Sequence, residues 1–150
     1  MKPAAPDPAG RRSFCCMACA ALALALLPTS LPAQAPPADP DPRRVTADTR
    51  ASLKAGTVKD YRKAGGFYLV ADGAGIYALT AICTHNGCKV VAEAGQGFGC
   101  PCHDSEYDLQ GNVVQGPARL PLRHFEVTEQ GPGGPLVVDL GKAVDAHVRF

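Results

Sequence analysis

Short apolar runs alternate with glycine-rich turns along most of the chain. Beyond residue 44, runs rich in Val, Ile, Leu, Tyr and Phe predict β-strands at residues 66–73, 75–83, 89–94, 111–116, 122–130 and 135–141. Turn sequences such as ADGAG and EQGPGG separate them. Only residues 50–56, RASLKAG, could form a helical turn. The pattern therefore predicts an all-β, antiparallel fold.

The first 35 residues have a different pattern. The sequence RRSF at residues 11–14 precedes an uncharged stretch whose most apolar part is residues 15–27. That part is shorter than the roughly 20 residues that a membrane-spanning helix needs. RRSF looks like a twin-arginine export signal, so we predict residues 1–35 as a signal that sends the domain to the periplasmic side. Pro36 follows the best small-residue cleavage site, which leaves open an uncleaved anchor in the cytoplasmic membrane.

Residues 36–44 are rich in proline and are predicted as an extended linker, with the folded domain over residues 45–150. Acidic and basic side chains nearly balance after residue 35, and no basic patch indicates nucleic acid binding. Three of the seven cysteines lie in the apolar N-terminal stretch. The other four lie in two loops of the predicted domain.

These two loops concentrate the candidate chemistry: CTHNGC at residues 83–88 and CPCHDS at residues 100–105. Each contains a Cys/His pair, and Cys88 and Cys102 are left over. A tetrahedral zinc site could use both pairs but gives Cys88 and Cys102 no role. Two disulfides would give the histidines no role. A catalytic Cys–His pair would need one activated thiol, whereas several compete here.

The two loops, the continuation CPCHDSEYD and the stretch GNVVQGPARLPL at residues 111–122 resemble the Rieske iron–sulfur proteins of the high-potential type, found in cytochrome bc and b/f complexes. The resemblance implies a small antiparallel Rieske-type β sandwich with a cluster-binding subdomain over about residues 81–118. It also implies a [2Fe–2S] cluster with one iron bound by Cys83 and Cys100 and the other by His85 and His103. A disulfide between Cys88 and Cys102 is implied as a tie between the loops.

The mixed ligand set has a physical consequence for the cluster. Two ferric ions, two sulfides and two thiolates sum to zero charge, so an electron enters a neutral cluster. This substitution accompanies Rieske potentials of roughly −150 to +300 mV, against about −400 mV for plant-type ferredoxins. The imidazole nitrogen that faces away from iron can carry a proton, so electron uptake and proton uptake can be coupled.

The resemblance also implies roles for residues beside the ligands. Ser105 and Tyr107 occupy the positions from which the family donates hydrogen bonds to the cluster sulfurs, and residues 116–118 look like the rigid loop that covers the cluster. Two positions depart from the family. Asn86 replaces a bulky apolar residue, and Asp104 replaces a glycine.

Two further histidines, His124 and His147, lie outside the loops. We predict both to be ordinary surface or half-buried side chains rather than ligands, because His124 falls in an alternating strand pattern with one solvated face and His147 lies near the C-terminus.

The leading functional hypothesis is an exported electron-transfer protein, the iron–sulfur subunit of a quinol–cytochrome c reductase-type complex rather than a stand-alone enzyme. Its expected partners are cytochrome b, a c-type cytochrome and quinol, with membrane association through the N-terminal segment. One alternative is the small electron-relay subunit of an exported molybdenum oxidoreductase, similar to arsenite oxidase. Others are a free Rieske ferredoxin and, more distantly, a structural zinc-binding module.

Overall fold

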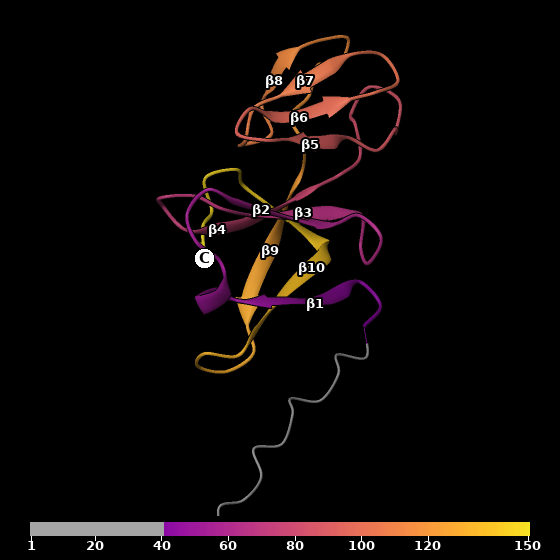
Figure 1. Ribbon diagram of the computed structural model, residues 1–150. Helices are drawn as coiled ribbons and strands as arrows, with labels where there is room; N and C mark the ends of the chain where they lie inside the picture. The colour runs from indigo at the N-terminus through magenta and orange to yellow at the C-terminus, as the bar shows by residue number, and fades with distance from the viewer. Residues whose placement is uncertain (1–40) are drawn as a thin grey trace, which may run out of the picture. The chain divides into compact units, whose positions relative to one another are not determined.

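The computed structural model describes residues 41–150, which form two antiparallel β-sheets (Figure 1). The first has six strands in the spatial order β1 (Arg44–Thr49), β10 (Pro135–Val144), β9 (His124–Glu129), β4 (Ile76–Thr80), β3 (Phe67–Ala71) and β2 (Thr57–Tyr61). The second has four short strands in the order β5 (Val91–Glu93), β6 (Gly97–Cys100), β7 (Ser105–Tyr107) and β8 (Val113–Gln115). The predicted all-β antiparallel fold is therefore confirmed.

The helical turn predicted within residues 50–56 is a short 3-10 helix, η1 (Arg50–Ser52).

Over residues 41–150, no helix has both the length and the apolar character needed to cross a membrane. The predicted export signal over residues 1–35 lies outside the described residues, as does the linker up to residue 40. Strand β1 starts at Arg44, one residue before the predicted start of the domain.

The six-stranded sheet folds over so that its two edge strands, β1 and β2, meet. The Asp48 N–H on β1 donates a hydrogen bond of 2.8 Å to the Tyr61 hydroxyl on β2, and the Asp48 carboxylate lies 3.4 Å from the Lys59 ammonium. Two layers result, β2–β3–β4 and β1–β10–β9, as Figure 1 shows. A core of buried apolar side chains lies between them: Phe67, Leu69, Ala71, Ile76, Ala78, Phe125, Leu136 and Val138.

Strand β3 is buried on both faces, which explains why its sequence FYLVA is apolar throughout rather than alternating. Successive side chains of a strand point to opposite faces. Phe67 and Leu69 accordingly enter the core within the six-stranded sheet, whereas Tyr68 and Val70 enter a second core. That second core lies against the four-stranded sheet and contains Tyr68, Val70, Tyr77, Leu79, Ala81, Cys83, Val90, Phe98, Cys100, Tyr107, Ala118 and Leu122.

The six predicted strands correspond to β3, β4, β5, β8, β9 and β10, but the sequence pattern misses β1, β2, β6 and β7. Strand β2 has a mixed pattern because it is an edge strand with exposed polar side chains. Strands β6 and β7 have the sequences Gly-Phe-Gly-Cys and Ser-Glu-Tyr, which contain no apolar run that would indicate a strand. Their pairing with each other makes them strands.

Candidate metal centre

The first loop of the candidate site, residues 83–88, leaves the end of β4 and closes on itself. The Cys83 N–H donates to the Cys88 carbonyl at 2.7 Å, and the Gly87 N–H donates to the Cys83 carbonyl at 3.0 Å. Gly87 has φ +75°, a left-handed conformation that glycine adopts without steric cost. The closed loop leaves His85 and Asn86 exposed at its tip.

The second loop connects β6 to β7 as a tight hairpin, with Cys100 paired to Ser105 across it. The Asp104 N–H donates to the Cys100 carbonyl at 3.1 Å, and Asp104 itself has φ +55°. This left-handed conformation gives a reason for the glycine that the family usually has here, although aspartate tolerates it better than most residues. The turn leaves His103 exposed.

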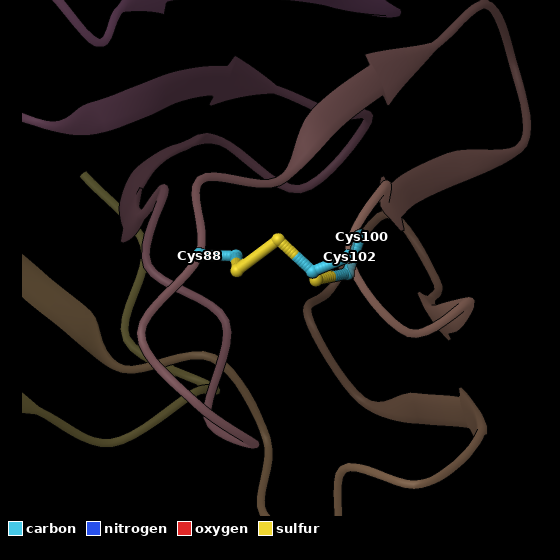
Figure 2. A group of neighbouring side chains, drawn as sticks. All are labelled: Cys88, Cys100 and Cys102. Atoms are coloured by element: carbon cyan, nitrogen blue, oxygen red, sulfur yellow. A yellow bond between two sulfur atoms is a disulfide. The ribbon is translucent and has the colours of Figure 1, made fainter.

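A disulfide between Cys88 and Cys102 joins the two loops, with a Cα–Cα distance of 6.5 Å. This is the pairing that the family resemblance implies. The Sγ atoms of Cys88, Cys100 and Cys102 all lie within 4.8 Å of one another, as the close-up in Figure 2 illustrates. The three do not form a metal site, because the two sulfurs of the disulfide are not thiolates and only a thiolate is a good metal ligand. Cys100 therefore remains available for another partner.

The other free thiol among residues 41–150 is that of Cys83. Both belong to the second core and are almost completely buried, with 2% and 3% of their surfaces exposed. The histidine rings lie outside, with centroids 4.7 Å apart and an edge-to-face angle of 84°. The structure thus buries the two sulfur donors in one core and leaves the two histidine rings close to each other at the surface. Two thiolates and two imidazoles are the donor set of a Rieske cluster, so the residues fit this cofactor.

The Tyr107 hydroxyl contacts the side-chain sulfur of a candidate ligand. This hydroxyl lies 3.2 Å from Cys83 Sγ and accepts a hydrogen bond of 3.1 Å from the Thr84 N–H. Burial alone would raise the pKa of the Cys83 thiol, but hydrogen bonds from Tyr107 and from the His85 N–H lower this pKa overall. Burial raises the pKa of Tyr107, which therefore keeps its proton at neutral pH and can donate it to a thiolate.

A third segment, residues 116–120, packs against both loops. The Ala118 N–H donates to the hydroxyl of Ser105 at 3.0 Å, and the Thr84 hydroxyl donates to the Leu120 carbonyl at 2.6 Å. Ser105 is fully buried, and because its oxygen accepts from Ala118, its own proton remains to be donated elsewhere. This segment, which begins with the cis bond Gly116–Pro117, fixes the two loops on their remaining side.

The predicted exposure of His124 is wrong, whereas His147 is exposed as expected. His124 is only 2% exposed, and its neighbour Phe125 is also buried, so the start of β9 has no solvated face. The alternating sequence predicted one solvated face, but the start of β9 is covered on both sides. His124 contacts Gln110 and Tyr77, and His147 contacts Asp145, so the candidate ligands remain those of the two loops.

Known proteins resemble this chain over the same region. A family model described as a Rieske [2Fe-2S] domain matches residues 43–126. The cytochrome b6-f complex iron-sulfur subunit of Synechococcus sp. strain RCC307 is 54% identical over 59 residues, which cover 37% of this chain and 33% of the relative. The chloroplastic subunit of the same name from Chlamydomonas reinhardtii is 50% identical over 58 residues, covering 37% of this chain and 28% of the relative. The matched segment is thus a third or less of the length of these curated relatives.

Among solved structures, the cyanobacterial plasma membrane Rieske protein PetC3 from Synechocystis PCC 6803 is 33% identical to this chain. The alignment covers 63% of this chain and 97% of that protein, with a TM-score of 0.49.

Proposed function

Since the chain belongs to the Rieske [2Fe–2S] family, we propose that Cys83 and Cys100 hold one iron of its cluster and that His85 and His103 hold the other. The cofactor of the domain is a Rieske [2Fe–2S] cluster. The burial of both thiols in the same core supports the assignment of Cys83 and Cys100. The close approach of the two exposed histidine rings supports the nitrogen side.

The domain acts in this proposal as the electron-transfer subunit of a quinol-oxidising cytochrome complex. The observation that carries it is the exposure of His85 and His103 at the tips of their loops. When bound, the cluster supplies a one-electron acceptor of high potential. The outer nitrogen of an exposed imidazole can accept a hydrogen bond and then a proton from a quinol hydroxyl. The similarity to cytochrome b6-f iron-sulfur subunits supports the same role, with cytochromes as electron partners.

The neighbouring hydroxyl groups raise the potential in this proposal. Tyr107 donates to the Cys83 sulfur, and Ser105, held by Ala118, donates toward the cluster. Hydrogen bonds to the sulfurs stabilise the more negative, reduced state.

The proposed location is the periplasmic side, reached through the twin-arginine sequence at residues 11–14. The disulfide between Cys88 and Cys102 supports an oxidising compartment, because disulfides seldom persist in a reducing cytosol.

The test is the reduction potential of the cluster-containing protein as a function of pH, measured by protein-film voltammetry. We expect the potential to fall as pH rises through the neutral to alkaline range, by up to about 59 mV per pH unit for each proton coupled to the electron. A potential that does not change with pH would contradict quinol oxidation and would favour a simple electron relay. Reduction of the oxidised protein by a soluble benzoquinol, followed by the visible spectrum, provides the second criterion.

Substitutions of Asp104 test how its carboxylate charge affects the reduction potential, separately from the backbone conformation at this position. We expect Asp104→Gly to raise the reduction potential, because the exposed carboxylate beside His103 disfavours an added electron. An exposed charge contributes about 0.2–1 kcal/mol, or roughly 10–40 mV for one electron, and less at high salt. Asp104→Asn is the matched control: it removes the charge, and asparagine also tolerates φ +55°. Voltammetry that finds either variant at or below the wild-type potential contradicts the prediction.

A further inference from the structure

The loop between β7 and β8, residues 108–112, is bound to the six-stranded part of the molecule through three successive carbonyl groups. The Tyr77 hydroxyl on β4 donates to the Leu109 carbonyl at 2.9 Å, and His124 Nε2 lies 2.8 Å from the Gln110 carbonyl. The Leu122 N–H, just before β9, donates to the Gly111 carbonyl at 2.8 Å. Because the loop directly follows Tyr107, these bonds hold the end of the strand that carries Ser105 and Tyr107.

His124 is the titratable member of this set. A carbonyl oxygen can only accept, so the contact with Gln110 requires the proton on Nε2. Nδ1 of the neutral ring then has no proton, and it is the one buried side-chain nitrogen or oxygen of residues 41–150 without a hydrogen-bond partner. The ring stacks on Tyr77 with centroids 5.3 Å apart and planes 13° from parallel. This environment accommodates a neutral imidazole and gives no acceptor to a second proton.

We propose that His124, as the neutral imidazole, is a positioning residue for the metal centre. It holds residues 108–112, and through them Tyr107, against the six-stranded sheet. When Nδ1 is protonated, it releases them. The release follows because a buried N–H without an acceptor and a buried charge are both costly. Tyr107 then loses its fixed position relative to Cys83 Sγ.

The charges around His124 agree with this behaviour. Burial is the largest influence and lowers the pKa of His124 overall, although the hydrogen bond to the Gln110 carbonyl raises it. The Arg149 guanidinium lowers it further. The carboxylates of Asp145 and Asp108 act in the opposite direction, and Arg149 is itself paired with Asp72 at 3.1 Å. Tyr77 is uncharged, since burial raises its pKa to about 12. The released state takes up a proton more readily than the bound state. Residues 108–112 therefore stay bound by His124 above the ordinary histidine pKa of about 6.5, and this attachment is lost as pH falls below it.

Two substitutions separate the hydrogen bond from the titration. His124→Gln keeps an N–H donor for the Gln110 carbonyl but does not titrate, and His124→Phe keeps a ring of similar volume without the donor. Hydrogen exchange of the Gly111 and Leu122 amides, which are bonded to Asp108 and Gly111, reports on the loop in the cluster-containing protein. We expect exchange in His124→Phe to be about tenfold faster than wild type at neutral pH, as an unsatisfied buried carbonyl implies, and His124→Gln to stay near wild type. In mild acid, the wild type should exchange faster than His124→Gln.

The second readout is the reduction potential at neutral pH, which should be lower in His124→Phe than in wild type and His124→Gln. This readout rests on the proposed ligand set, whereas hydrogen exchange does not, so a failure of one is distinguishable from a failure of the other. Wild-type exchange rates in His124→Phe at neutral pH would overturn the positioning role. Equal acceleration of wild type and His124→Gln in acid would overturn the role of Nδ1. If His124→Phe does not fold, the comparison of wild type with His124→Gln in acid decides.

Discussion

The His103→Ala variant should be purified without the visible absorbance of an iron–sulfur cluster, with iron and acid-labile sulfide at least about tenfold below wild type. The proposed ligand set gives one iron only two protein ligands, His85 and His103. Removing one opens that iron to water and leaves it bound through a single imidazole. The measurement is iron and sulfide analysis after full reconstitution, together with visible circular dichroism.

The matched control is His147→Ala, the same substitution at an exposed histidine outside the loops. It should retain full iron content and an unchanged spectrum. Because His103 is also exposed, its loss removes no core packing, and far-ultraviolet circular dichroism should show that the β-sheets persist. Full iron content with a Rieske-type spectrum in His103→Ala would refute the ligand assignment.

Gly97→Ala should destabilise the protein by about 3–5 kcal/mol, the sum of backbone strain and steric overlap. Gly97 has φ +131°, and a Cβ atom there would overlap the backbone carbonyl oxygen of Tyr107. The overlap cannot be relieved by a side-chain rotation, since the obstacle is the backbone of β7. We therefore expect β6 and β7 to separate and cluster content to fall with them, because Cys100 ends β6.

Gly95→Ala tests whether this effect is specific to position 97. Gly95 lies in the turn just before β6 with φ +73°, but a Cβ atom there would meet nothing within 4 Å. Only the conformational cost remains, about 1 kcal/mol. Chemical denaturation of both variants provides the comparison, and equal stabilities would contradict the argument.

The strands that the sequence predicts are those whose apolar runs are long enough to be recognised. FYLVA in β3 is apolar throughout because the strand is buried on both faces. The four-stranded sheet is different. The sequence of β7 is Ser-Glu-Tyr, which has no β-like signal of its own; it is a strand because β6 and β8 pair with it.

The features of the candidate site also divide into those that the sequence predicts and those that depend on contacts between distant residues. The Cys/His spacing within each loop is local, so the candidate ligands Cys83, His85, Cys100 and His103 can be named from the sequence, and their roles as iron ligands remain a prediction. The contact between Tyr107 and Cys83 joins residues 24 positions apart, and that between His124 and Gln110 joins residues 14 apart. The alternating pattern around His124 predicts a solvated face, which the second core covers.

The sequence by itself determined the β-rich character of residues 41–150, the turns between most strands, and which cysteines and histidines lie in each of the two loops. Each of these depends on residues close together in the chain. Only the tertiary structure decided that Cys83 and Cys100 are buried while His85 and His103 are exposed, and that His124 lies sealed beneath the β7–β8 loop. Burial depends on which distant segments pack together, and no local pattern carries that information.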